Sequence, residues 1–150
     1  MLSLSDDERE VLLTEVRQAL DQVRAPELRV QYGELLTAVD AGAVDAELLE
    51  PLQTLLEVGL ESGRIRKVHL AHGEMAARAV FQRTPKGRAL QAGAAEVNRA
   101  LAGLRGRSIE EVRVAATGPG SFSLTLTTDE GTVLLQFSRS GVAVRSLEVG

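Results

Sequence analysis

The chain has 150 residues, of which 44% are hydrophobic and 25% charged, and its formal net charge is −4. This length and composition suit one compact domain or two small modules that share a core, and they exclude a disordered chain. No cysteine is present, which excludes disulfides, thiol catalysis and cysteine-ligated metals. The acidic N-terminus does not resemble a signal peptide, and no stretch approaches the length of an apolar membrane span. We therefore expect a cytoplasmic protein that does not contact the membrane.

The charges are distributed unevenly along the chain. Residues 1–62 carry four basic and fourteen acidic side chains, residues 63–107 ten basic and two acidic, and residues 108–150 three basic and five acidic. The three net charges are therefore −10, +8 and −2. The middle third is the natural contact surface for an anionic partner, either a phosphate backbone or an acidic protein. The alternative is that it neutralises the acidic first third within one fold.

Two helices are expected at the start of the chain. Ser5, with Glu8 three residues later, forms a capping box for a first helix with one apolar face. Pro26 can occupy the first position of a second helix, which is interrupted at Gly42. Tyr32, the single tyrosine, lies on the apolar side of this helix. We expect its ring to pack and its hydroxyl to lie at a rim.

A third helix is expected before Gly63, although its start is ambiguous. Pro51 removes a helical hydrogen bond, so that the helix either kinks at this residue or begins there. Its polar positions are neutral or acidic: Gln53, Thr54, Glu57 and Glu61. This helix therefore lacks a basic side chain that could meet a phosphate or a guanine.

A β-hairpin is predicted after the third helix. Gly63 can end that helix because glycine adopts the left-handed conformation without strain. The short runs 64–70 and 76–82 then read as strands on either side of a glycine-containing loop at residues 71–75. Thr84 and Pro85 follow with an N-cap hydroxyl and a proline at the first helical position. A new helix should therefore begin at Pro85.

This order of parts resembles the recognition-helix end, the wing and the following helix of MarR- and PadR-like winged-helix regulators. The resemblance spans about residues 45–104 and lies in Leu55, Leu56, Gly59-Leu60, Gly63-Arg64-Ile65 and Thr84-Pro85-Lys86-Gly87-Arg88-Ala89-Leu90. It implies DNA binding, with one helix in the major groove and the wing near a phosphate backbone. Two features depart from the family pattern, because the expected recognition helix is acidic and a β-rich tail follows the module.

Seven basic residues in the expected hairpin and at the start of the next helix are the candidate nucleic-acid-binding residues: Arg64, Arg66, Lys67, Arg78, Arg83, Lys86 and Arg88. Along a wing they would make phosphate contacts that position the protein without reading sequence. The alternative is a solvated hairpin whose arginine stems cover an apolar underside. His69, His72 and Glu74 superficially suggest metal ligands, but no fourth partner is in view. We expect the histidines to be ordinary surface residues.

The helix that begins at Pro85 carries an apolar stripe at heptad spacing, formed by Leu90, Ala94, Val97, Leu101 and Leu104. This stripe is either a dimer seam, which we favour, or the face on which the β-rich tail docks. Gly103 and Gly106 then interrupt the helical pattern and make the backbone more flexible. They mark the expected boundary between two domains, residues 1–106 and residues 107–150.

The tail predicts a four-stranded antiparallel meander. Apolar and hydroxyl-bearing residues alternate over residues 121–127 and 132–138, and valine-containing runs flank this central hairpin. The last strand changes phase at Leu147 and Val149, which predicts either a bulge or a strand end near the edge. A sheet with one apolar face must lie against helices or against a second copy of itself.

The sequence thus predicts an α+β protein, with a winged-helix-like module of three helices, basic wing and following helix before the β-meander. No nucleophile with a base, carboxylate pair or metal cluster stands out, so we expect neither an enzyme nor a bound cofactor or metal. The favoured function is that of a homodimeric regulator that binds nucleic acid, DNA in particular, through the wing. The alternative is a winged-helix-like adaptor that contacts acidic protein surfaces without binding DNA.

Overall fold

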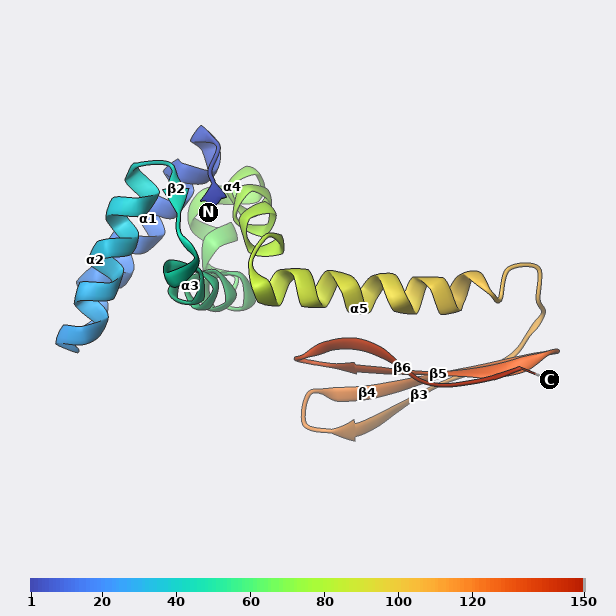
Figure 1. Ribbon diagram of the computed structural model, residues 1–150. Coiled ribbons are helices and arrows are strands. Elements are labelled where there is room, and N and C mark those ends of the chain that lie inside the picture. The colour runs from blue at the N-terminus through green and yellow to red at the C-terminus, as the bar shows by residue number, and fades with distance from the viewer. Residues whose placement is uncertain (150) are drawn as a thin grey trace. The chain divides into compact units, whose positions relative to one another are not determined.

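The computed structural model describes residues 1–149 and confirms the α+β class, with helices first and an antiparallel sheet last (Figure 1). The elements in chain order are β1 (Leu2–Ser3), α1 (Asp6–Gln22), α2 (Pro26–Asp40), β2 (Ala43–Val44), the 3₁₀ helix η1 (Ala46–Leu48), α3 (Leu49–Glu61), α4 (Arg64–Gln82), α5 (Pro85–Ala102), β3 (Ile109–Gly118), β4 (Ser121–Thr128), β5 (Gly131–Ser138) and β6 (Gly141–Val149). None of the helices within residues 1–149 has the length and apolarity needed to cross a membrane.

The chain divides into two compact units. Unit 1 comprises Met1–Arg88 and unit 2 begins at Ala89. The division falls inside α5, whereas the boundary predicted from the glycines lies at residue 106.

The starts of the first three helices follow from their local sequences. Ser5 and Glu8 form the predicted capping box, because the Ser5 hydroxyl accepts from the Glu8 N–H at 3.3 Å and the Glu8 carboxylate accepts from the Ser5 N–H at 2.9 Å. Pro26 is the first residue of α2, as predicted. Helix α3 begins at Leu49, so Pro51 lies in its first turn. A proline is tolerated there because N–H groups of the first turn lack helical partners.

The predicted β-hairpin at residues 64–82 is wrong, because this segment forms helix α4. Its buried residues Gly73, Ala77 and Val80 recur at helical rather than alternating spacing, and the expected loop at residues 71–75 contains the helix formers Ala, Glu and Met. Gly73 serves packing rather than a turn, since a Cβ at this position would overlap the Cβ of His69. The basic β-hairpin wing is therefore absent, and its cations lie on a helix.

Helix α4 is broken at Leu70. The backbone of this residue has φ 61° and ψ −167°, which lies in a region that residues other than glycine rarely adopt. Such a conformation costs about 1–3 kcal/mol. The Leu70 side chain is 71% exposed, so burial of this side chain does not offset the strain.

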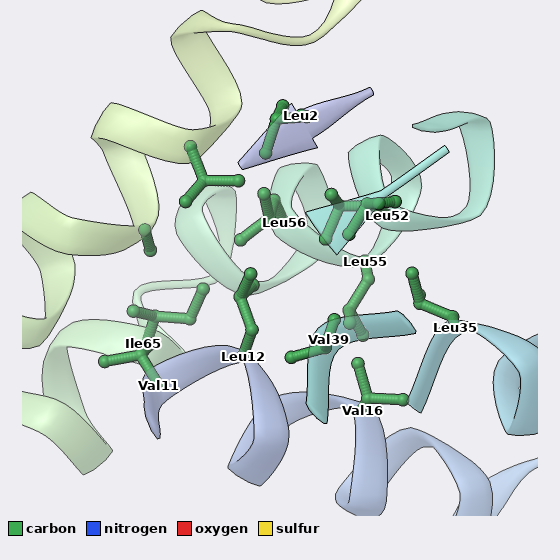
Figure 2. Packing of buried hydrophobic residues seen from close by; sticks show 13 residues of the cluster. Leu2, Val11, Leu12, Val16, Leu35, Val39, Leu52, Leu55, Leu56 and Ile65 are labelled. Carbon is green, nitrogen blue, oxygen red and sulfur yellow. The ribbon is translucent and has the colours of Figure 1, made fainter. Parts of the chain in front are cut away.

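The core of unit 1 is formed by apolar side chains from its four helices and the short β1–β2 pair (Figure 2). Leu12 and Val16 of α1 lie against side chains of α2 and α3, and Ile65 brings the start of α4 into the same cluster. The whole cluster comprises Leu2, Val11, Leu12, Val16, Leu35, Val39, Val44, Leu52, Leu55, Leu56, Ile65, Ala77 and Val80. Strand pairing of Leu2 with Val44 ties the N-terminus to this core.

Unit 2 is the predicted antiparallel meander, in the strand order β3-β4-β5-β6, with α5 along one face (Figure 1). Val97 of α5 is buried with Val133 and Leu135 of β5, and Leu101 and Leu104 pack against the same cluster. The apolar stripe of α5 thus docks on the sheet. This is the second of the two alternatives predicted for the stripe, and not the one that we favoured.

Of the two alternatives predicted for the last strand, the bulge is the one found. Leu134 pairs with Ser146, whereas Leu135 pairs with Val144, so Arg145 is an extra residue on β6. A one-residue insertion moves the following side chains to the other face, which explains the phase change at Leu147.

Replacement of Leu70 by glycine should raise the free energy of unfolding by about 1 kcal/mol, because glycine adopts the observed backbone conformation without steric strain. Leu70→Ala is the matched control, since it also removes the exposed side chain but retains a Cβ. Urea unfolding of both variants measures the difference. Equal stability of the two variants would show that the backbone at this position is not strained.

Tyr32 provides a spectroscopic test of the unit 1 core. Burial raises the pKa of its hydroxyl above the ordinary value of 10.0. The chain has one tyrosine and no tryptophan, so absorbance titration reports this group alone. We expect a midpoint above 10.0 for the folded protein, and about 10 in denaturant. Since the unfolded chain then ionises first, the free energy of unfolding should fall as the pH rises above about 10, and Tyr32→Phe should lack this component.

Candidate interaction surface on helix α4

Most of the seven candidate nucleic-acid-binding residues are paired with acidic side chains of unit 1. The pairs are Arg64 with Glu15, Arg66 and Arg78 with Glu74, Arg83 with Glu8, and Lys86 with Glu57. Within residues 1–149, Lys67 and Arg88 are the two members of the set without an ion pair. Much of the positive charge at residues 64–88 is therefore neutralised inside the unit.

Glu15 is the most deeply buried of these acids, with 0% of its surface exposed. The Arg64 guanidinium pairs with one carboxylate oxygen, and His69 Nε2 lies 2.9 Å from the other. Arg64 also donates to Gln18 Oε1 at 2.7 Å. A buried carboxylate is tolerated when it is paired and hydrogen-bonded in this way. The network fixes the first turns of α4 against α1, up to the residue that precedes the break.

The two histidines differ in their surroundings. His72 is a surface residue as expected, with 81% of its side chain exposed and its Nε2 atom 3.4 Å from Asp7 Oδ2. The expectation of an ordinary surface residue is wrong for His69, whose side chain is 14% exposed because it packs over Glu15. Both histidines line a shallow hollow of about 160 Å³ together with Asp7, Glu10 and Thr14. Among residues 1–149, no three His, Asp or Glu side chains are grouped so that they could hold a metal ion.

Helix α3, which would be the recognition helix of a winged-helix protein, directs polar groups at the start of α5. The Gln53 side-chain oxygen accepts from the Lys86 N–H at 2.9 Å, and the Glu57 carboxylate pairs with the Lys86 ammonium. Thr84 caps α5 as predicted, since its hydroxyl accepts from the Gly87 N–H at 3.2 Å. The polar side of α3 thus supports the next helix.

Exposed apolar and basic side chains lie before, at and after the α4 break. We call this set the α4 surface, and it comprises Arg66, Lys67, Val68, Leu70, Met75 and Arg78. Val68, Leu70 and Met75 are 52%, 71% and 70% exposed. The side chains of Arg66 and Arg78 are 70% and 64% exposed and share the carboxylate of Glu74 across the break. Lys67 adds a third cation to this set, so that the three cations together with Glu74 carry a net charge of +2.

Sequence reasoning missed both the break and the buried acid. The strain at Leu70 has no local signal, because neither glycine nor asparagine occupies the position. Glu15 did carry a signal, since it lies three residues after Leu12 and next to Val16 on the apolar side of α1. An acid inside an apolar stripe indicates a buried, paired carboxylate.

Comparison with protein-family models, with curated proteins and with solved structures gives no match for this chain. The resemblance to MarR- and PadR-like regulators thus stays a prediction.

Glu15→Gln should lower the free energy of unfolding by about 2 kcal/mol, because it removes the charge that Arg64 and His69 face in a mostly buried site. Asp40→Asn is the matched control. Asp40 pairs with Arg9 at 2.9 Å, but the two side chains are 63% and 40% exposed, so this loss should be at most about 0.5 kcal/mol. Denaturant unfolding compares the two variants. Equal losses would show that the Glu15 network does not hold α4 in place.

Proposed function

We propose that this protein is a non-enzymatic adaptor that binds an acidic protein partner through the α4 surface. The observation that carries the proposal is Leu70, a large apolar side chain that is 71% exposed on a strained backbone. Strain of this kind costs stability, and it persists in proteins chiefly where it serves function. The cytoplasmic location expected from the sequence belongs to the same proposal.

The chemistry of the α4 surface supports a protein partner. Protein interfaces combine an apolar centre, often with methionine and arginine, with a polar rim. Val68, Leu70 and Met75 supply the apolar part, and Arg66 with Arg78 supplies cations at its edge. A partner segment with apolar side chains flanked by carboxylates would match both parts.

The charge of unit 1 disfavours a nucleic-acid partner. Residues 1–88 carry fifteen acidic and eleven basic side chains, a net charge of −4. Phosphate binding relies on a run of several available cations, and Arg64, Arg83 and Lys86 are each paired one to one with a carboxylate. Exposed apolar side chains add nothing to a phosphate contact.

Nucleic-acid binding, as the winged-helix resemblance implies, is the second candidate. It is favoured by the density of positive charge in residues 64–88, which hold seven basic residues and one acid. Lys67 and Arg88, which lack ion pairs within residues 1–149, would be the first to reach a phosphate. The contact would come from helices α4 and α5, since the wing is absent.

Site-specific photocrosslinking in the protein's own cells tests the adaptor proposal. A photoreactive residue at position 70 should trap a discrete partner, and Arg66→Glu combined with Lys67→Glu should abolish the adduct. Position 30 on α2 is the matched control, because Val30 is 63% exposed but lies outside the α4 surface. Equal crosslinking from both positions, or none from position 70, would contradict the proposal.

Fluorescence anisotropy with a nonspecific DNA duplex at two salt concentrations separates the two candidates. The adaptor proposal expects no binding by the full chain even at low salt. Binding with a steep salt dependence, reduced by Arg66→Glu with Lys67→Glu, would favour the nucleic-acid candidate instead.

A further inference from the structure

Strand β3 is an open edge of the sheet in unit 2. It pairs with β4 alone in this sheet, and each of its residues from Ile109 to Gly118 is exposed. It contains no proline or lysine of the kind that protects edge strands, and its central pairing over residues 111–116 is regular. The other edge, β6, is interrupted by the bulge at Arg145. Edges without protection are templates for further strand pairing.

The apolar face of the sheet is also incompletely covered at β3. Val112 and Val114 pair with Leu126 and Leu124, so they share the face on which α5 packs. Val133 and Leu135 on β5 are buried, at 0% and 1% exposure, whereas Val112 and Val114 are 55% and 65% exposed. One helix thus covers the β5 side of the face and leaves the β3 side open. Whatever pairs with β3 has to extend this apolar face.

The charges on β3 match a second copy of the same strand. Glu111 and Arg113 flank Val112 and lie 2.6 Å apart on the polar face. Antiparallel pairing of two copies about a two-fold axis at Val112 places each Glu111 opposite Arg113 of the second copy. An axis at Glu111 or at Arg113 would place like charges opposite each other, which destabilises strand pairing.

We propose that two copies of this chain join through β3, in antiparallel register about Val112, into one eight-stranded sheet. The two-fold axis stands perpendicular to the sheet, so the apolar faces of both copies lie on the same side. The exposed Val112 and Val114 of each copy then meet in the middle of this face, between the two α5 helices. This interface is independent of the α4 surface and of the function proposed for it.

Cysteine crosslinking tests the register directly, because the chain contains no cysteine of its own. Residues directly opposite in an antiparallel pair have Cα atoms about 4.5–5.5 Å apart, within the range that a disulfide spans. With oxidised glutathione present, full-length Val112→Cys should form a covalent dimer. Val114→Cys is the matched control of similar exposure, and it should crosslink at least about tenfold more slowly, since four residues of offset separate the two positions by about 13 Å. Faster crosslinking of Val114→Cys would overturn the register, and failure of both would overturn the interface.

Charge reversal tests the same interface without a covalent bond. Sedimentation velocity should show a dimer whose Kd rises about tenfold in Glu111→Arg and in Arg113→Glu. Each change places like charges opposite each other at positions 111 and 113, and the two-fold axis creates two such pairs in the dimer. The double variant restores opposite charges and should return to within about twofold of the natural chain. Arg145→Glu on β6 should leave the Kd unchanged. A chain that is monomeric at all concentrations would overturn the proposal, and so would a dimer whose Kd is unchanged by the single reversals.

Discussion

A carboxylate buried among leucines and valines imposes the constraint on which unit 1 depends. Glu15 has no exposed surface, so its charge has to be met by cations of the same unit. Arg64 meets it from the first turn of α4, and His69 Nε2 lies within hydrogen-bond distance of its second oxygen. This requirement holds the basic start of α4 against the acidic helix α1. It explains why some of the cations that the sequence suggests for ligand binding instead stabilise the fold. Arg83 pairs with Glu8 at the other end of α4, and Lys86 pairs with Glu57 at the start of α5.

The anchored start of α4 also bears on its break. Ile65 is buried in the core and His69 is held on Glu15, while Gly73 lies so close to His69 that no side chain fits there. The chain turns between these fixed points at Leu70, at the expense of backbone strain. The result is an exposed apolar side chain among cations, a combination that suits a protein partner better than a phosphate backbone.

The open surface of unit 2 arises because one helix, α5, is too narrow to cover a sheet of four strands. A sheet with one apolar face needs cover across its whole width, and α5 covers it on the side of β5. The helix leaves the valines of β3 exposed, and Glu111 and Arg113 beside them lie on the opposite, polar face of the strand. Each unit thus offers its own surface. Unit 1 has the α4 surface with its apolar and basic side chains, and unit 2 has the open edge strand β3.

Local signals in the sequence determined the helix starts at Ser5, Pro26 and Pro85, the four-stranded meander and its bulge, because capping groups, prolines and period-two alternation act within a few residues. The tertiary structure alone decided that residues 64–82 form a helix. Isolated short runs around Val68 and Val80 suit a strand as well as a helix, and burial of Ala77 and Val80 against the core selects the helix. It likewise decided which cations are free, since ion pairs such as Arg64 with Glu15 join residues far apart in the chain. Strain at Leu70 arises from the same long-range anchors, and no local pattern encodes it.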